Sequence, residues 1–282
     1  MSAPVPAAGP AGSVGLLGAG VMGEAVLAAV LRGGTPAAAV LVAEPSAERA
    51  AEVARRHGVR TDLTPADVAA GSDTVLVAVK PKDVPGVLDA IAGHLRPGAL
   101  VVSVAAGVTT SAMGDRLPTG TPVVRVMPNT PAVIGRGAAA ICPGPHATGA
   151  HLDAVEALLA PTGTVVRVGE GDMDAVTAIS GSGPAYVFYL VDALAEAGVL
   201  LGLSRAQALE LATATFAGAA QLLESGGEHP VVLRERVSSP GGTTVAALRE
   251  LDAHGVRAAI LAAAEAARDR SRELGSASDT AR

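Results

Sequence analysis

The sequence predicts an α/β protein in which an N-terminal, doubly wound sheet domain is followed by a C-terminal, all-α domain. Short apolar runs alternate with amphipathic helical stretches up to about residue 168, which is the βαβ pattern of a doubly wound sheet. Beyond residue 171 the chain becomes mostly helical and rich in Ala and Leu. With 282 residues, of which 49% are hydrophobic and 17% charged, the chain is long enough for two folded cores.

The expected strands are continuously apolar instead of alternating, as when helices cover both faces of a parallel sheet. They are residues 14–18, 39–44, 74–79, 99–107, 121–127 and 163–169. Amphipathic segments such as residues 46–58 lie between them and are expected to be helices.

The second half of the chain predicts a helical bundle that associates with another subunit. Residues 204–224 carry Ala, Leu and Phe around much of the helix circumference, which indicates burial, and in a small domain this indicates a subunit interface. We therefore expect a flexible tail at 1–12, a dinucleotide-binding domain at 13–170, a helical substrate-binding and dimerisation domain at 171–275, and a flexible tail at 276–282.

Composition limits the location and the partners. The net charge of −6 argues against nucleic acid or an anionic membrane as a partner. The single cysteine, Cys142, allows no intramolecular disulfide and no cysteine metal cluster, so no metal is expected. The first residues have no basic region followed by an apolar run, and no apolar stretch reaches the roughly 18 residues of a membrane helix. These observations predict a cytoplasmic protein.

A glycine-rich loop predicts a dinucleotide site. Gly18, Gly20 and Gly23 follow a predicted strand with the spacing G-x-G-x-x-G and precede a predicted helix, and this context is typical of the Rossmann fold. Glu44 ends the next strand, where an acid accepts hydrogen bonds from a ribose 2′-hydroxyl and favours NADH. Alternatively, Glu44 points away and Ser46 or Arg49 receives the 2′-phosphate of NADPH.

Two further loops follow the carboxyl ends of strands, where ligands bind in such sheets. Lys80 is notable there because only Lys80 and Lys82 are lysines among 21 basic residues. The small residues Ala105, Ala106 and Gly107 would allow a coenzyme to approach the backbone. The candidate coenzyme contacts are Gly18, Ala19, Gly20, Val21, Met22, Gly23, Glu44, Ser46, Val79, Lys80, Pro81, Ala105, Ala106 and Asn129.

Two other segments are candidates for the substrate site. Asn129 lies between two prolines, where its amide would orient a nicotinamide or a substrate, unless it only forms an Asx-turn. The segment "SSPGGTT" (238–244) enters a predicted helix with more hydroxyls and backbone N–H groups than a cap requires, which suits an anion. The alternative is an ordinary loop capped by Ser239 or Thr243.

A strong general base is absent from the expected helical domain. That half contains no lysine, and the histidines, with His229 as the best exception, fall on polar faces or loops. This counts against the oxidation of an alcohol and against a keto acid, whereas a protonated C=N bond is electrophilic without a strong acid or base.

The segments "GLLGAGVMGEA", "AVKP", "VVSVAAGVT", "RVMPNTPA", "ISGSGPAYVF", "GLSRAQA", "GEHP" and "SSPGGTT" occur in this order between about residues 14 and 272. Together they closely resemble the pyrroline-5-carboxylate reductases, which make proline. The resemblance implies an N-terminal Rossmann domain, a C-terminal helical domain that dimerises by interlocking, and assembly of dimers into decamers. It also implies NADPH or NADH as the coenzyme. Members of the family often have a neutral or basic residue in place of Glu44 and commonly prefer NADPH, so Glu44 is a departure that leaves the coenzyme preference open.

The resemblance implies specific roles at the substrate site. The loop would hold the substrate carboxylate, Thr244 would be the catalytic residue whose hydroxyl bonds the ring nitrogen, and Asn129 would line the site. The candidate substrate-binding residues are Ser239, Gly241, Gly242, Thr243, Thr244, Asn129 and Ser180. In the turn 180–184, Ser182 is equally a candidate cap of the helix 184–201. The alternatives are a reductase of another cyclic imine and an NAD(P)-binding sensor without turnover.

Overall fold

The computed structural model describes the backbone of residues 12–280 and the side chains of residues 12–275. The expected tail at 1–12 therefore lies almost wholly outside the described residues. The chain divides into two compact units, residues 1–182 with 267–282, and residues 183–266. This division falls later than the domain boundary expected at 170/171, and the last helix returns to the first unit.

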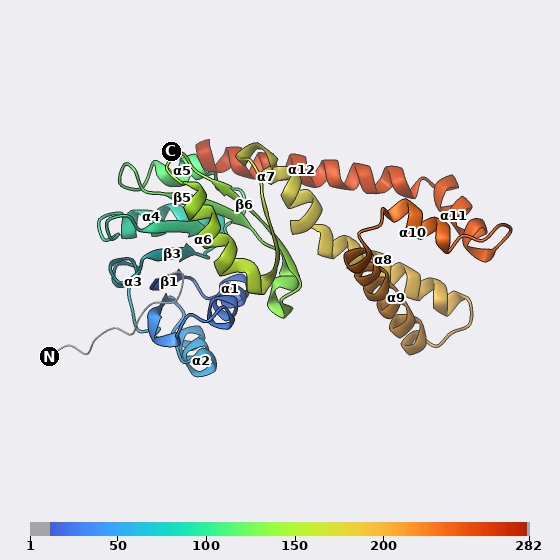
Figure 1. Ribbon diagram of the computed structural model, residues 1–282, viewed down its shortest axis with the longest axis horizontal. Coiled ribbons are helices and arrows are strands. Elements are labelled where there is room, and N and C mark those ends of the chain that lie inside the picture. The colour runs from blue at the N-terminus through green and yellow to red at the C-terminus, as the bar shows by residue number, and fades with distance from the viewer. Residues whose placement is uncertain (1–11, 281–282) are drawn as a thin grey trace. The chain divides into compact units, whose positions relative to one another are not determined.

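The first unit is built on a seven-stranded sheet with the order β2-β1-β3-β4-β5-β6-β7 (Figure 1). Its strands are β1 (Val14–Leu17), β2 (Val40–Ala43), β3 (Thr74–Val77), β4 (Leu100–Ser103), β5 (Val123–Met127), β6 (Gly137–Pro143) and β7 (Gly163–Arg167). The strands β1 to β5 pair in parallel. Their carboxyl ends consequently meet at one edge, as the doubly wound prediction requires.

The strand β6 was missed by the sequence analysis and makes the sheet mixed. It runs antiparallel to β5 and parallel to β7, with Arg125 opposite Cys142. Its sequence, GAAAICP, is rich in alanine, which has low strand propensity, so the local sequence carried no signal. Pairing with two neighbouring strands is what makes this segment a strand.

Helices cover both faces of the sheet, so two apolar cores form. One core joins the sheet to α1 (Val21–Arg32), α2 (Ala47–His57) and α6 (Gly149–Leu159). The other joins it to α3 (Pro65–Gly71), α4 (Val84–Ala92) and α5 (Thr110–Gly114). Strands β1, β3 and β4 are buried throughout, which explains their continuous apolar sequence.

Local capping sets several helix ends. The Ser46 hydroxyl accepts a hydrogen bond from the backbone N–H of Arg49 at the start of α2, and Gly58 ends the helix in the left-handed region at φ +69°. Shorter turns connect the elements: η1 (Ala37–Ala39), η2 (Pro81–Asp83), η3 (Thr130–Ile134), η4 (Ala160–Thr162), η5 (Glu170–Asp172), α7 (Met173–Val176) and the π-helical turn η6 (Thr177–Gly181).

The second unit is helical. It contains α8 (Gly183–Leu200), α9 (Arg205–Gly226), α10 (Pro230–Arg236), α11 (Thr243–Ala253) and the first part of α12 (Val256–Thr280). Its small core packs α8 against α9 through Ala195, Ala208 and Ala212. The helices approach closely at Gly198, where a Cβ would lie 2.8 Å from the Cβ of Ala208.

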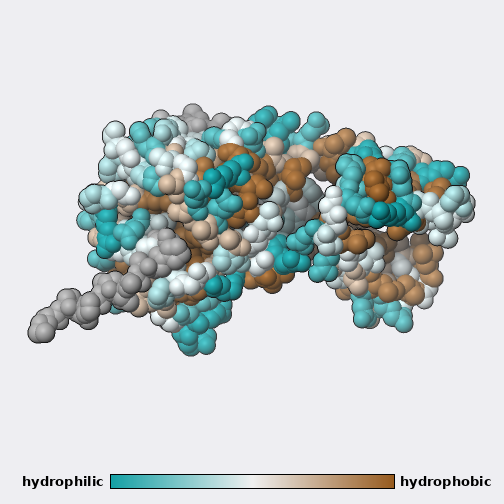
Figure 2. All heavy atoms as spheres, viewed as in Figure 1, coloured by the Kyte–Doolittle hydropathy of each residue, from teal (hydrophilic) through white to brown (hydrophobic). Residues whose placement is uncertain are grey.

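Many large apolar side chains of these helices are exposed in the single chain, and apolar patches are visible on its surface (Figure 2). Phe188, Tyr189, Leu200 and Leu211 are between 57% and 87% exposed. The burial expected for residues 204–224 is therefore not achieved within one chain, and the exposed side chains require another surface to cover them.

The helix α12 extends beyond the residue at which the sequence analysis placed a tail. Ser271 is buried and its hydroxyl donates to Asp174 Oδ1 at 2.7 Å, so the helix is anchored in the first unit. Helix propagation from this anchored turn carries the backbone to Thr280, through residues 276–280 that were expected to be a tail.

Candidate active site

The three glycines of the first loop have the separate roles that a dinucleotide turn requires. Gly18 has φ +89°, and a Cβ there would lie 2.8 Å from the carbonyl oxygen of Ala78. A Cβ on Gly23 would lie 2.3 Å from the carbonyl oxygen of Gly18, so this glycine permits the close packing of α1 on the turn. A Cβ on Gly20 would meet no atom within 4 Å, which leaves open space at the start of α1. The residues present therefore fit a bound pyrophosphate.

The start of α1 supplies the attraction for that anion. Gly20 is the N-cap, and no side chain caps the helix. Val21, Met22 and Gly23 form its first turn, where backbone N–H groups and the helix dipole favour a negative charge.

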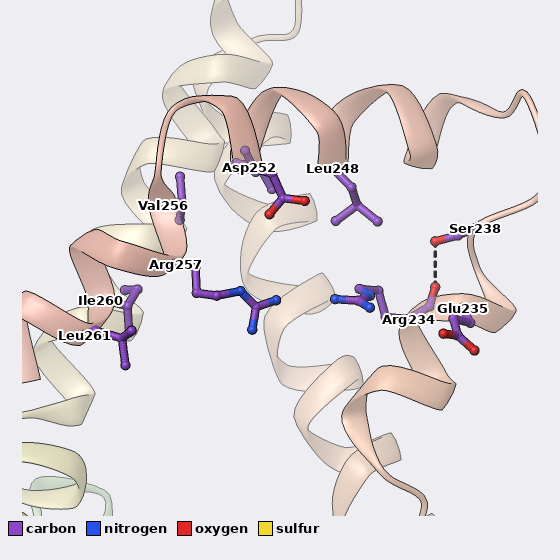
Figure 3. Close-up of a pocket in the computed structure, with 10 residues that line it drawn as sticks. Arg234, Glu235, Ser238, Leu248, Asp252, Val256, Arg257, Ile260 and Leu261 are labelled. Carbon is purple, nitrogen blue, oxygen red and sulfur yellow. Dashed lines mark hydrogen bonds between the residues drawn. The ribbon is translucent and has the colours of Figure 1, made fainter.

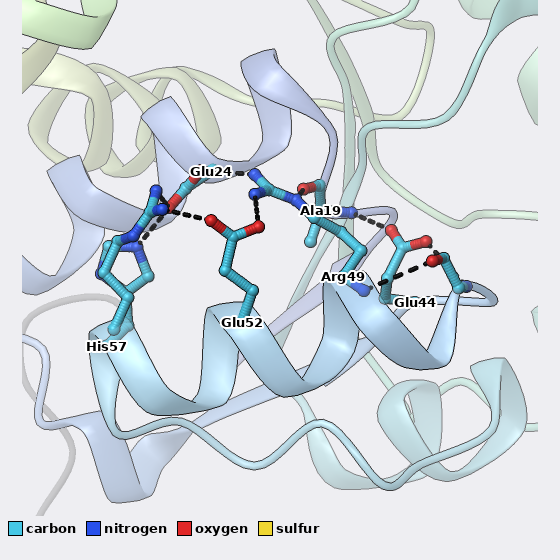
Figure 4. A network of polar contacts seen from close by, with 8 residues as sticks. Ala19, Glu24, Glu44, Arg49, Glu52 and His57 are labelled. Atoms are coloured by element: carbon cyan, nitrogen blue, oxygen red, sulfur yellow. Dashed lines mark hydrogen bonds and ion pairs between the residues drawn. The ribbon is translucent and has the colours of Figure 1, made fainter.

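Glu44 lies against the glycine loop. Its Oε2 accepts the Ala19 N–H at 2.7 Å and its Oε1 accepts the Ser46 N–H at 3.0 Å (Figure 4). The carboxylate is thus fixed beside the loop and does not point away from it. Glu44, Ser46 and Arg49 line a cavity of about 520 Å³ together with Gly20 and Val21.

The other coenzyme candidates follow the ends of β3 and β4. Lys80 and Pro81 are exposed and Val79 is half-buried, and the Lys80 side chain makes no ion pair among the described residues. Ala105 is buried with its N–H bonded to the Ser103 hydroxyl at 3.2 Å, whereas Ala106 is exposed. The parallel strands therefore bring these segments to the same edge as the glycine loop.

Asn129 connects two segments that are distant in the chain. The residue is 9% exposed, its Nδ2 donates to the carbonyl of Ser180 at 3.1 Å, and its Oδ1 accepts the N–H of Ala138 at 2.8 Å. This differs from an Asx-turn, because both partners are remote in sequence. Ser180, in η6, donates its hydroxyl to the carbonyl of Val176 at the end of α7. Asn129 thus holds the turn after β5 against the turn that contains Ser180.

An ion pair between a buried arginine and a partly exposed glutamate lies close to these two turns in the chain and was missed by the sequence analysis. Arg125, 3% exposed on β5, binds Glu170 at the start of η5. Glu170 also accepts hydrogen bonds from the N–H and hydroxyl of Thr110, at 3.1 and 2.7 Å. Arg125 is a charged residue inside the apolar run 121–127, and this charge was the feature of the sequence that could have indicated an ion pair.

Burial and hydrogen bonding set the charge states in this cluster. Burial raises the pKa of Glu170, but the hydrogen bonds from Thr110 and the charge of Arg125 outweigh it and lower the pKa. Burial and the neighbouring Glu170 raise the pKa of the Cys142 thiol to about 12. Glu170 is therefore ionised and Cys142 is an unreactive thiol at neutral pH.

The loop between α10 and α11 is built around an uncapped helix N-terminus. Gly242 is the N-cap of α11 and no side chain caps it, so neither Ser239 nor Thr243 acts as the cap that the alternative required. Gly241 has φ +72°, and the Gly242 N–H donates to Ser239 O at 2.9 Å. A Cβ on Gly242 would lie 2.6 Å from the Ser239 hydroxyl. The loop exposes the first turn of an 11-residue helix, at Thr243 and Thr244.

The start of this loop, at Ser238, is held by the preceding helix α10. The Ser238 hydroxyl donates to Arg234 O at 2.7 Å, where α10, α11 and α12 line a cavity of about 620 Å³ (Figure 3). His229 is the N-cap of α10 and its Nδ1 accepts the Val231 N–H at 3.3 Å. This histidine therefore has a structural role. Ser182 follows η6 and its N–H donates to Thr177 O at 2.8 Å.

The described residues bear on metal binding and on membrane association. No group of three or more His, Cys, Asp or Glu side chains there could hold a metal ion. The helical run Glu170–Leu200 is long and apolar enough to cross a membrane, by length and composition only. One such helix is weak support for a membrane, and its exposed apolar side chains equally suit an interface between subunits.

The glycine turn, the uncapped α1 and the fixed acid after β2 define a dinucleotide-dependent oxidoreductase of the Rossmann class. Residues 13–107 match the family model described as NADP oxidoreductase coenzyme F420-dependent, and residues 170–274 match pyrroline-5-carboxylate reductase dimerisation.

Full-length relatives identify the family. A pyrroline-5-carboxylate reductase from Corynebacterium melassecola is 43% identical over 266 residues, covering 93% of this chain and 98% of the relative. The solved pyrroline-5-carboxylate reductase of Coxiella burnetii has a TM-score of 0.90 at 31% identity, covering 94% of this chain and 98% of the other. That of Plasmodium falciparum, solved with NADP bound, has a TM-score of 0.83 at 27% identity over 94% and 98% of the chains. The chain belongs to the pyrroline-5-carboxylate reductase family, so the predicted fold class and family are confirmed.

Proposed function

We propose that this protein reduces 1-pyrroline-5-carboxylate to L-proline with NADH or NADPH. The reaction consumes one proton and one hydride, which add to the nitrogen and the carbon of the C=N bond, and it releases the oxidised coenzyme. Family membership supports the reaction, and the observation in this chain that carries it is the uncapped, glycine-flanked start of α11. It offers backbone N–H groups to a carboxylate.

The proposed role of the chain is to bind and align two ligands. The turn Gly18 to Gly23 and the start of α1 bind the coenzyme pyrophosphate, and Glu44 accepts hydrogen bonds from the ribose. Val79 to Pro81, Ala105 and Ala106 line the remaining length of the coenzyme. When bound, the coenzyme supplies the hydride.

The substrate carboxylate is held by Ser239, Gly241, Gly242 and Thr243, and the Thr244 hydroxyl bonds the ring nitrogen as the amine forms. Alignment of donor and acceptor then supplies most of the acceleration, because the imine is already electrophilic. Asn129 and Ser180 shape the wall between the turns that follow β5 and α7.

The experiment is to follow the absorbance of NADH and NADPH with and without 1-pyrroline-5-carboxylate. Oxidation that depends on this substrate supports the proposal. A six-membered cyclic imine carboxylate in a parallel assay tests the alternative substrate. Coenzyme binding without oxidation by either imine would contradict the proposal and favour a sensor. L-Proline with NAD⁺ or NADP⁺ provides a further test, because a reductase is stabilised by both ligands together and a sensor by the nucleotide alone.

The match to a dimerisation domain indicates self-association through residues 170–274. We propose that dimers assemble further into decamers, and that the protein is cytoplasmic with neither a membrane nor nucleic acid as a partner. The exposed apolar surface of α8 then belongs to the subunit interface. Light scattering coupled to size exclusion measures the subunit number directly, and a mass of one subunit at micromolar concentration would contradict self-association.

A further inference from the structure

Arg49 is the cation closest in sequence to Glu44, the acid that follows β2, and its guanidinium group already has partners. Its Nε donates to Ala19 O at 2.7 Å, and its Nη1 donates to Glu52 at 2.6 Å. Its Nη2 binds Glu24 of α1. Each of the three guanidinium nitrogens therefore has a partner, and the side chain is 24% exposed (Figure 4).

Glu24 is the centre of this network. It lies on α1, is 15% exposed, and binds Arg49, Arg56 and His57, all from α2. Burial raises the pKa of Glu24, but the hydrogen bonds from His57, Arg49 and Arg56 outweigh it and lower the pKa to about 2. Glu52 bridges the same two arginines. Two carboxylates thus neutralise two guanidinium groups at physiological pH.

The network borders the space where the adenosine ribose would lie. Glu24, Glu44, Ser46 and Arg49 line the same cavity as Gly20. In a Rossmann domain the acid after the second strand binds the ribose hydroxyls, whereas a 2′-phosphate requires an arginine that is free to donate to it. A 2′-phosphate in this cavity would face the Glu44 carboxylate and the guanidinium of Arg49. That guanidinium is already bound by the carboxylates of Glu24 and Glu52.

We infer that Glu24, with Glu52, holds Arg49 away from the 2′-phosphate and so acts as a positioning residue by which the site selects NADH over NADPH. This inference rests on the proposed function and adds the choice of coenzyme. It assigns the choice between NADH and NADPH to side chains of α1 and α2 as well as to Glu44. The backbone of Ala19 donates its N–H to Glu44 and accepts from Arg49 at its carbonyl, so these two side chains also fix the glycine loop.

The test compares the dissociation constants of NADH and NADPH, measured by calorimetry without any imine. In the wild type NADH is expected to bind more tightly. Glu24→Gln is expected to lower the ratio Kd(NADPH)/Kd(NADH) about tenfold, which corresponds to about 1.4 kcal/mol. Glu52→Gln, at a more exposed position, provides a second variant with the same direction of change if the first folds poorly.

Two controls make the assignment specific. Glu48→Gln removes a negative charge from α2, one residue before Arg49 in the sequence. The Glu48 carboxylate has no hydrogen bond or ion pair among the described residues. It is expected to leave the ratio unchanged. Adding Arg49→Met to Glu24→Gln is expected to abolish the gain in NADPH binding, whereas adding Arg56→Met is not.

Three results would overturn the inference: a wild type that prefers NADPH, an unchanged ratio in Glu24→Gln, or a gain that depends on Arg56 instead of Arg49. Any of them can occur while the protein still oxidises reduced coenzyme in the presence of 1-pyrroline-5-carboxylate, so the proposed function would stand. Failure of the wild type to bind either dinucleotide would overturn both.

Discussion

Thr244 is the residue on which the proposed chemistry depends most directly. It is half-buried in the first turn of α11, beside an N-terminus that no side chain caps. Thr244→Val keeps the shape and removes the hydroxyl. We expect kcat/KM for the imine to fall about tenfold, the value of roughly one hydrogen bond in the transition state, with coenzyme Kd unchanged.

Steady-state kinetics and calorimetry measure these two quantities. The matched control is Thr215→Val in α9, where the hydroxyl donates to Leu211 O in its own helix. An unchanged kcat/KM in Thr244→Val would remove this hydroxyl from the mechanism.

Glu24 also makes the stability of the first unit depend on pH. Its pKa is about 2 in the folded protein against an ordinary value of 4.5. A depressed carboxyl pKa stabilises the folded state above the unfolded pKa, and this contribution is lost as the pH falls from 4.5 towards 2. Urea titrations should therefore show that Glu24→Gln costs stability at pH 6 to 8. The difference from the wild type should shrink below pH 4.5, and a constant difference down to about pH 2 would contradict the assignment.

At the scale of elements, the pair Arg125–Glu170 ties β5 to η5 and α5. Arg125 precedes the turn after β5, and Glu170 precedes the turn that contains Ser180. Asn129 joins these two turns by its hydrogen bond to the carbonyl of Ser180. Removing the charge of Glu170 leaves Arg125 buried without a compensating charge. Glu170→Gln is expected to lower the free energy of unfolding by about 3 kcal/mol.

Chemical denaturation of the single and double variants tests this view of the pair. The double variant Arg125→Met/Glu170→Met is expected to recover much of the loss, because an apolar pair leaves no buried charge. If the double variant lost the sum of both single effects, the two residues would not act as a pair.

At the scale of the whole molecule, the helical unit is incomplete as a single chain. Its core is small, while Phe188 on α8 is 66% exposed. Phe188→Glu is expected to shift the protein towards monomers and to lower its Tm at a given protein concentration, because association stabilises the fold by mass action. Light scattering and thermal melts over a range of concentrations measure this. Ala90→Glu on the exposed side of α4 is the control, and an unchanged oligomer in Phe188→Glu would remove this residue from the interface.

The sequence by itself determined the features that depend on local composition. Continuous apolar runs indicated buried parallel strands, and the spacing of Gly18, Gly20 and Gly23 indicated the turn, because φ above zero and close packing both require glycine. The order of the motifs was enough to indicate the family, which full-length relatives confirm.

Only the tertiary structure decided the features that depend on partners far apart in the chain. An alanine-rich segment became β6 because β5 and β7 offered backbone hydrogen bonds. Asn129 joins two segments because Ala138 and Ser180 lie within hydrogen-bond distance of its amide. Arg49 is held in an ion pair because α1 brings Glu24 to it. Strand pairing and ion pairs depend on distance in space, so the local sequence can supply the groups but only the folded chain can decide which of them meet.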